Sequence, residues 1–275
     1  MWPEMEIICV GNELLIGKTL NTNAHWLAGK ATEAGMNVRR ITVVADEVSE
    51  IATAIIEAFE RKPRFVVTTG GLGPTFDDKT LEGIARCFNR KLVVNQKALE
   101  MVRQKYESYD RHQPSPKIEL TPARMKMATL PEGTDPLPNP VGTAPGMILQ
   151  TDNTTLVALP GVPPEMQAIF NQSVILLLRK EAGGSGFYAT SMYVAHMMES
   201  MLAPLIDGVM NDNPGVYIKS HVYTGSSPQT EGERSPIELH LSMTAENPQI
   251  AKECLERAAA QLRALIQKEG GHVKT

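Results

Sequence analysis

The stretch Thr68-Thr69-Gly70-Gly71-Leu72-Gly73-Pro74-Thr75-Phe76-Asp77-Asp78 decides the fold expected for this chain. It follows an apolar run at 65–67, typical of a buried parallel strand, and precedes an amphipathic segment at 79–88, typical of a helix. A strand, a glycine-rich turn and a helix form a common anion site, because glycines let the backbone approach a phosphate and helix N–H groups point at it. Asp77 and Asp78 would repel a bare phosphate, so the stretch predicts a phosphate site assisted by a divalent metal.

Strand-like and helix-like segments alternate on the N-terminal side of this stretch. We expect strands at 6–10, 38–44 and 65–69. Between them we expect a helix that Asn21 to Asn23 cap, ending near Ala34, and a second helix capped by Ser49. This alternation predicts βαβ units and a mostly parallel sheet. Right-handed crossovers would bring the turns that start at Gly11, Asp46 and Gly70 to one sheet edge, where ligands bind in such sheets.

The region after the stretch is less regular. A charged segment at 96–109 reads as a helix, the segment at 111–117 as a polar loop, and Thr121-Pro122 as the start of a short helix. Residues 147–150 and 155–159 predict a β-hairpin that turns at Asp152-Asn153. A helix should follow Pro163-Pro164, with inward side chains Ile169, Phe170, Val174 and Leu177.

The glycine-rich linker at 183–186 predicts a boundary between two domains, 1–182 and 183–275. The second would be a small α+β module with strands at 187–195, 216–223 and 237–244, helices at 197–210 and 248–268, and a mobile loop at 225–235. In its last helix we expect a buried stripe of Ile250, Cys254, Ala258, Leu262 and Leu265. The predicted fold class is therefore a doubly wound, mostly parallel α/β domain followed by a smaller α+β module.

Composition narrows the functional classes. Apolar residues make up 42% of the 275 residues, which is enough for a core. The net charge of -4 argues against a general nucleic-acid binder. Three scattered cysteines predict reduced thiols in a cytoplasmic protein, with Cys9 as a buried structural thiol. We expect neither a signal peptide nor a membrane span, and the spacing of the six histidines does not favour zinc.

Four blocks of the sequence together resemble a known family. They are Val10 to Gly17 with Asn21 to Asn23, Thr68 to Asp78, Asn139 to Gly146 (NPVGTAPG) and Leu159 to Met166 (LPGVPPEM). Over about residues 4–180 they resemble the N-terminal domain of the competence-damage-inducible protein CinA, part of the molybdopterin-binding MogA/MoaB superfamily. Residues 186–275 resemble the KH-type module that follows this domain in CinA proteins. Full-length CinA proteins end in a nicotinamide-nucleotide deamidase domain, which this chain stops short of, so deamidation is not expected.

The resemblance implies a doubly wound domain, usually dimeric or higher, with nucleotide pyrophosphatase activity toward ADP-ribose or a related dinucleotide. It implies a divalent metal, Mg²⁺ or another cation, held by Asp46 and Asp78, which match the two family aspartates by position. The MogA branch of the superfamily binds and adenylylates molybdopterin. Leu72 and Phe76 depart from that branch, which has threonine and a nearby basic residue there, so the pyrophosphatase alternative is favoured.

Pyrophosphate hydrolysis suggests a role for each group of residues. Asp77 or Glu13 would orient the attacking water, while Glu13 could instead orient a helix or bind ribose. Backbone N–H groups of Gly70 to Gly73 and of Thr75 would take phosphate oxygens, helped by the hydroxyls of Thr69 and Thr75. Glu165 would reach the ribose or serve as a first-turn charge. The remaining expected substrate-binding residues are Gly11, Asn12, Asn23, Gly71, Gly73, Pro74, Asn139, Gly142, Thr143, Gly146 and Gly161.

Three functions stay open from the sequence: a pyrophosphatase, a molybdopterin-binding or molybdopterin-adenylylating protein, and a non-catalytic nucleotide-binding protein. For the second module we expect an interaction or dimerisation role rather than RNA binding. Its only GxxG segment, 183–186, precedes the first strand, and from Gly186 onward 7 basic residues stand against 10 acidic ones.

Overall fold

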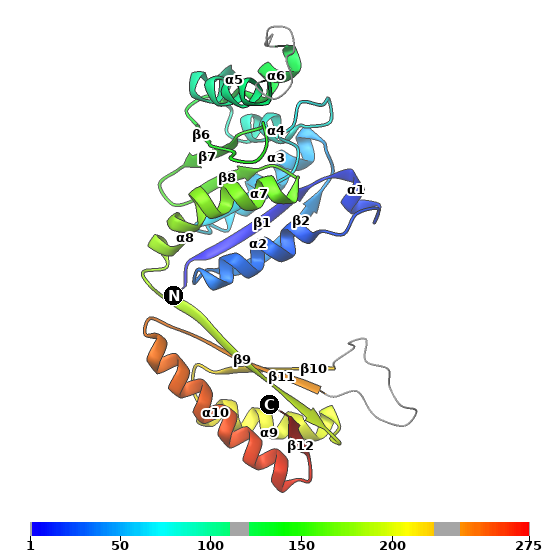
Figure 1. Cartoon of the computed structure of the whole chain (residues 1–275), viewed down its shortest axis with the longest axis vertical. Helices are drawn as coiled ribbons and strands as arrows, with labels where there is room; N and C mark the ends of the chain where they lie inside the picture. The colour runs from blue at the N-terminus through cyan, green and yellow to red at the C-terminus, as the bar shows by residue number, and fades with distance from the viewer. Residues whose placement is uncertain (1, 111–120, 223–236, 275) are drawn as a thin grey trace. The chain divides into compact units, whose positions relative to one another are not determined.

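A computed structural model describes residues 2–110, 121–222 and 237–274 of the chain. The chain divides into two compact units, Met1–Ala182 and Gly183–Thr275, shown in Figure 1. The loops expected at 111–117 and 225–235 lie outside the described residues. In the described part of the chain, no helix combines the length and the apolar character needed to cross a membrane.

A six-stranded sheet forms the centre of the first unit. Its strands are β1 (Glu4–Val10), β2 (Asn37–Val44), β3 (Phe65–Thr69), β6 (Asp135–Leu137), β7 (Gly146–Gln150) and β8 (Thr155–Leu159), in the order β2-β1-β3-β8-β7-β6. The pairs from β2 to β8 are parallel, and the pairs β8–β7 and β7–β6 are antiparallel. The expected mostly parallel sheet and the hairpin at 147–159 are confirmed.

Helices cover both faces of this sheet, which makes the unit doubly wound (Figure 1). One face packs against α3 (Val48–Glu60), α4 (Thr80–Cys87), α5 (Gln96–Asp110) and α6 (Pro122–Met127), the other against α2 (Thr22–Glu33), α7 (Pro163–Ile169) and α8 (Ile175–Glu181). Side chains of β1 alternate between the faces, with Ile8 on the α3 side and Ile7 and Cys9 on the α2 side. Strands buried on both faces read as continuous apolar runs, as this one does. Burial raises the pKa of the Cys9 thiol, in line with a structural role.

Short elements complete the unit: α1 (Asn12–Leu15), and the ribbon of β4 (Leu92–Val94) with β5 (Thr129–Pro131). Asn21 caps α2 by accepting a hydrogen bond from the Ala24 N–H at 3.0 Å, and Thr121 caps α6, both as expected. The expectation for Ser49 is wrong. Helix α3 begins one residue earlier, at Val48, and its N-cap residue Glu47 makes no side-chain cap bond.

A π-helical turn at Phe170–Val174 joins α7 to α8. A π-turn inserts one extra residue into the helical repeat and so rotates the following side chains. Ile169, Phe170 and Val174 are buried as expected, but after the turn Leu178 is the fully buried leucine and Leu177 is only half-buried.

In the described residues of the second unit, a four-stranded antiparallel sheet packs with two helices. The strands are β9 (Gly186–Ala195), β10 (Tyr217–Val222), β11 (Ile237–Ala245) and β12 (His272–Lys274), in the order β10-β11-β9-β12. Helices α9 (Glu199–Asp212) and α10 (Pro248–Lys268) share one hydrophobic cluster with the sheet. The element order β-α-β-β-α-β agrees with the expected α+β module, and its KH-type identity stays a prediction.

The expected buried stripe of α10 is partly wrong. Ala258 and Leu262 are buried, but Ala251, Leu255 and Ile266 complete the stripe in place of Ile250, Cys254 and Leu265. Ile250 is 53% exposed. The sequence contains two overlapping apolar stripes at helical spacing, one beginning at Ile250 and one at Ala251. The prediction chose the stripe that begins at Ile250. The chain instead packs small Ala251 at the start of the helix.

Candidate functional site

The turns after β1, β2 and β3 meet in one crevice at the carboxyl ends of the parallel strands. The loop that follows β8 and the loop at 139–146 form its other side. Its volume is about 340 Å³. Of the residues expected at the site, those lining this crevice are Gly11, Glu13, Asp46, Gly70, Gly71, Gly73, Pro74, Asp77, Asp78, Thr143, Gly161 and Glu165.

A smaller cavity of about 100 Å³ adjoins the crevice and shares Glu13, Gly70 and Gly161 with it. Two further expected residues, Asn23 and Thr69, line this second space. The expected meeting of these turns at one sheet edge is therefore confirmed, because the carboxyl ends of neighbouring parallel strands share an edge.

The crevice is acidic. Five of its lining side chains carry carboxylates, from Glu13, Asp46, Asp77, Asp78 and Glu165. Among the described residues that line it, none is a lysine or an arginine. A phosphorylated ligand would meet net repulsion here unless a cation accompanied it.

Two glycines shape the turn after β3. Gly70 and Gly71 both have positive φ, at 105° and 68°, a conformation that other residues rarely adopt. A Cβ on Gly70 would lie 2.2 Å from the carbonyl oxygen of Val10 in β1. The Thr80 hydroxyl donates to the Gly70 carbonyl at 2.7 Å and fastens the turn to the start of α4. Gly70 is thus required by the close packing of the turn on β1, whereas a Cβ on Gly71 would meet the Thr80 hydroxyl at 2.4 Å.

Two N–H groups of this turn are already engaged. The Gly70 N–H donates to the Leu159 carbonyl at 3.0 Å, and the Thr75 N–H donates to Asp78 Oδ2 at 2.8 Å. The expectation that these two groups take phosphate oxygens is therefore wrong for this geometry. A sequence pattern shows where N–H groups occur, but not which of them the neighbouring strand and side chains occupy.

The end of the turn is a hydrogen-bonded acidic loop. The Thr75 hydroxyl lies 2.5 Å from Asp77 Oδ1 and 2.5 Å from Asp78 Oδ2, and its single proton can be donated to only one of them at a time. Hydrogen bonding by this hydroxyl, then by backbone N–H, lowers the pKa of Asp77 below its ordinary value. Nearby Lys126 and Lys79 lower this pKa further.

Lys126 is a residue that the sequence analysis missed. Its ammonium group, on α6, donates to the Thr75 carbonyl and lies close enough to favour ionised Asp77. Lys126 belongs to none of the sequence motifs, and it lies 51 residues along the chain from Thr75, whose carbonyl it contacts. Only the folded chain brings α6 beside the turn.

The loop predicts a specific titration result. Thr75→Val should raise the pKa of Asp77 toward its ordinary value, and by more than Lys126→Met does, because the hydroxyl is the larger cause. Since the folded-state pKa is depressed, ionised Asp77 adds stability above its unfolded pKa, and this is lost as pH falls through the folded value. Carboxyl carbon chemical shifts followed by NMR across pH 2 to 6 measure both variants. A larger effect of Lys126→Met would contradict the assignment.

Asp46 is held by the turn after β1. The Asn12 N–H donates to Asp46 Oδ2 at 2.7 Å, and the Asp46 N–H donates in return to Asn12 Oδ1 at 3.4 Å. The carboxylate of Glu13 folds over Gly11, where an added Cβ would lie 2.5 Å from Glu13 Oε1. Asn12 thus positions Asp46, and Gly11 leaves room for Glu13.

Asn23 and Asn139 hold loops around the crevice. The Asn23 amide donates to Thr69 Oγ1 at 3.1 Å and to the Gly161 carbonyl at 2.8 Å. The Asn139 amide donates to the Ala144 carbonyl at 2.8 Å and to Glu165 Oε2 at 2.7 Å. Asn139 Oδ1 accepts from the Gly142 N–H at 2.7 Å. These contacts make both asparagines positioning residues.

Gly142 and Gly146 differ in their surroundings. A Cβ on Gly142 would lie 1.9 Å from Glu165 Oε2, so this glycine lets the Glu165 carboxylate approach the loop. Gly146 is instead buried in β7, where an added Cβ would lie 3.0 Å from the Ala158 carbonyl oxygen. The structure thus places Gly146 in the packing of the sheet and not along the crevice.

The carboxylates fit a hard cation that brings ligands of its own. Among the described residues, no three His, Cys, Asp or Glu side chains come together as a ready metal site. Zinc sites in proteins need three or four such ligands. Mg²⁺ instead keeps several waters and binds through one or two carboxylates plus substrate phosphates. Asp46 and Asp78 both line the crevice, and their role as ligands of such an ion stays a prediction.

Comparisons with known proteins agree with this layout. Residues 6–180 match the family model described as "Probable molybdopterin binding domain". A protein of Metallosphaera sedula is 41% identical over 267 residues, 97% of this chain and 95% of its own length. One from Pyrobaculum calidifontis is 43% identical over 97% of both chains. The crystal structure of a CinA protein of unknown function from Thermoplasma acidophilum is 42% identical, with a TM-score of 0.57, over 63% of this chain and 98% of its own.

Proposed function

Because this chain belongs to the family of the probable molybdopterin binding domain and its first unit is CinA-like, we propose that its crevice hydrolyses the pyrophosphate bond of a dinucleotide such as ADP-ribose. The observation that carries the proposal is the crevice's charge. Five carboxylates and, among its described lining residues, no basic side chain suit a ligand that arrives with a divalent cation. A pyrophosphate binds such cations tightly through its oxygens.

The hydrogen bonds of the crevice residues support a separate role for each of them. Asp46 and Asp78 would hold Mg²⁺ or another divalent ion, which supplies electrostatic stabilisation of the phosphoryl oxygens. Asp46 is oriented for this by the Asn12 N–H, and Asp78 by the Thr75 N–H. Both carboxylates are therefore already held in place, so binding the ion would cost them little conformational entropy.

A water-orienting base would come from Asp77 or Glu13. The lowered pKa of Asp77 makes it a weaker proton acceptor, so its role would be to orient the water by accepting a hydrogen bond from it. Glu13 lies in the turn after β1, over Gly11. Glu165, held by Asn139, would meet the ribose hydroxyls as a hydrogen-bond acceptor.

A second candidate, binding or adenylylation of molybdopterin, is favoured by the family match over residues 6–180. The molybdopterin phosphate would meet the same acidic crevice and need the same cation. A third candidate, nucleotide binding without catalysis, uses the same contacts without a positioned water. Each of the three proposals expects a small anionic ligand rather than nucleic acid, a cytoplasmic location and a homo-oligomer.

Metal dependence is the prediction that tests the proposal. With Mg²⁺ present, the full chain should release AMP from ADP-ribose, and an excess of EDTA should lower the rate about 100-fold or more because no divalent ion then stands between the phosphates and the five lining carboxylates. Chromatographic detection of AMP measures this for ADP-ribose and FAD side by side. Restoring Mg²⁺ should restore the rate.

The outcomes separate the candidates. Absence of AMP from every dinucleotide tested would overturn the pyrophosphatase. Calorimetric binding of molybdopterin without AMP release would favour the second candidate, and binding of ADP-ribose without turnover the third. AMP release that EDTA leaves unchanged would contradict the metal role of Asp46 and Asp78.

A further inference from the structure

One sheet edge in the second unit is largely unpaired. Strand β9 pairs with β11 over residues 186–194, but on its other side β12 pairs only with Tyr193, Val194 and Ala195. Among the described residues, no other backbone group bonds to the segment 186–192 on that side. The N–H and C=O groups that this segment presents there are therefore available to a further strand.

This edge lacks the features that usually protect one. Edge strands commonly carry a lysine, a proline or a bulge that hinders pairing with another chain. The segment 186–192 reads GFYATSM, without a charge or a proline, and its pairing with β11 is regular. Ala189, Thr190 and Ser191 are exposed. A long, exposed and uncharged edge of this kind favours pairing with a partner strand.

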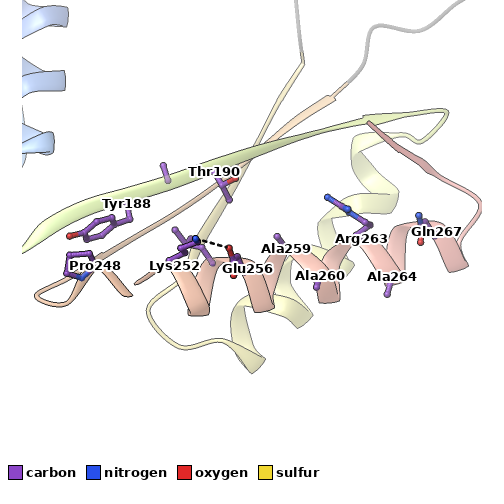
Figure 2. A pocket seen from close by; sticks show the side chains of 12 residues that line it. Tyr188, Thr190, Pro248, Lys252, Glu256, Ala259, Ala260, Arg263, Ala264 and Gln267 are labelled. Carbon is purple, nitrogen blue, oxygen red and sulfur yellow. Dashed lines mark ion pairs between the residues drawn. The ribbon is translucent and has the colours of Figure 1, made fainter. Parts of the chain in front are cut away.

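A groove lies beside this edge, between β9 and α10, and we call it the α10 groove (Figure 2). Its volume is about 790 Å³, its lining is mostly apolar, and residues 188–190 line it from the strand. On the helix, Leu255 and Ala259 belong to the packing of the unit's own core and separate the groove from it. Ala260 and Ala264 are exposed and small, so they leave room for side chains of another molecule.

Strand β12 runs toward the open edge. It is antiparallel to β9, and Lys274 in it faces Tyr193. The next position along the same line would face Met192, which belongs to the unpaired segment. A further strand placed there would continue the line of β12 beside β9. Because side chains of a strand alternate between its two faces, every second residue would enter the groove over α10.

The charges of the groove favour a strand with an acidic side chain. Its charged lining residues are Lys252, Glu256 and Arg263, so the groove is net positive although the module has 7 basic residues against 10 acidic ones. Lys252 and Glu256 are exposed and pair with each other at 3.9 Å.

Arg263 is the charged residue that the chain leaves without a partner. Figure 2 shows its side chain extending from α10 toward β9. It is half-buried, and its Nε is covered by the chain itself without a hydrogen-bond partner among the described residues. A carboxylate on a strand in the groove would pair with the remaining N–H groups of this guanidinium.

We propose that the α10 groove binds an extended segment of a partner protein, which pairs with β9 as a further antiparallel strand. Apolar side chains of the segment occupy the groove at every second position, and one acidic side chain meets Arg263. In added strands of this kind the backbone hydrogen bonds give affinity and the side chains give specificity. The matching segment of a second copy, 186–192, has no carboxylate to offer. The proposal does not depend on the activity of the crevice in the first unit.

A synthetic peptide tests the backbone pairing. The probe is about seven residues long, with valine alternating with threonine and one valine replaced by glutamate. It should bind the full chain and slow amide hydrogen exchange at 187–192, because N–H groups of the edge become hydrogen-bonded. The same peptide with N-methylated backbone amides is the matched probe. It lacks the N–H donors that pairing requires and should not bind.

Charge reversal tests the contact with Arg263. Arg263→Glu should weaken binding of the glutamate peptide about 10-fold or more, and should favour a peptide with lysine in that position. Lys268→Glu is the matched control, because it makes the same charge change on exposed α10 surface outside the groove. Ala264→Phe, at an exposed lining position, fills the groove without disturbing the core and should also abolish binding.

Fluorescence anisotropy of the labelled peptides measures binding, and hydrogen exchange followed by mass spectrometry locates it. Absence of protection at 187–192 with the glutamate peptide would overturn the proposal. Equal binding of the N-methylated peptide would also overturn it, because the contact would then not use the backbone. So would protection of 187–192 that rises with the concentration of the chain alone, since a second copy would then occupy the edge.

Discussion

Asp78→Asn should lower the rate of AMP release from ADP-ribose by about 100-fold or more while leaving the fold intact. Asparagine has nearly the shape of aspartate and keeps a carbonyl oxygen that can accept the Thr75 N–H, which now donates to Asp78 Oδ2 at 2.8 Å. The turn should therefore survive. What is lost is the negative charge, and with it the capacity to hold a divalent cation beside the glycine-rich turn. Steady-state kinetics at several Mg²⁺ concentrations measure the loss.

The Mg²⁺ dependence separates a ligand from a merely structural residue. If Asp78 holds the ion, the variant should need a higher Mg²⁺ concentration for half-maximal rate than the parent chain does. Asp152→Asn provides the matched control, because Asp152 is an exposed residue in the turn between β7 and β8, outside the crevice, and should keep full activity. An Asp78→Asn variant as active as the parent would remove Asp78 from the site.

The first unit was predictable in outline because its inner strands β1, β3 and β8 are buried on both faces. Apolar runs such as 65–67, followed by polar turns, leave few topologies that short right-handed crossovers can connect. That logic places Gly11, Asp46 and Gly70 at one edge without any contact being known, and the structure confirms their meeting in one crevice. The hairpin at 147–159 was predictable because its turn residues lie directly between its two strands in the sequence.

What escaped prediction depends on distant packing. Lys126 reaches the acidic loop across 51 residues, and the Gly70 N–H is taken by Leu159 on a strand far away in the sequence. The π-turn at 170–174 changes which leucine is buried. No residue of this segment signals a π-turn in the sequence. In α10, two overlapping apolar stripes differed by one position, and the sheet beneath the helix selected the one with Ala251.

The glycines of the turn after β3 carry the largest expected effect on stability. At Gly70 two costs coincide. Its φ of 105° is strained for any residue with a Cβ, at about 1–3 kcal/mol. The added Cβ would also lie 2.2 Å from the carbonyl oxygen of Val10, which belongs to the backbone of a central strand that cannot move aside cheaply. Overpacking of this kind costs about 1–3 kcal/mol more.

Gly70→Ala should therefore lower the free energy of unfolding by about 2–6 kcal/mol, and the melting temperature of the first unit by about 10 °C. Gly29→Ala is the opposite control: Gly29 lies inside α2 with open space around its Cα, so alanine should stabilise the helix by about 0.5–1 kcal/mol. Calorimetry of both variants measures the two shifts, which should differ in sign. If Gly70→Ala melted with the parent chain, the turn would have to relax away from β1, and the crevice whose floor it forms could not have the shape described. The stability of this one variant thus tests the geometry on which the metal and phosphate assignments both depend.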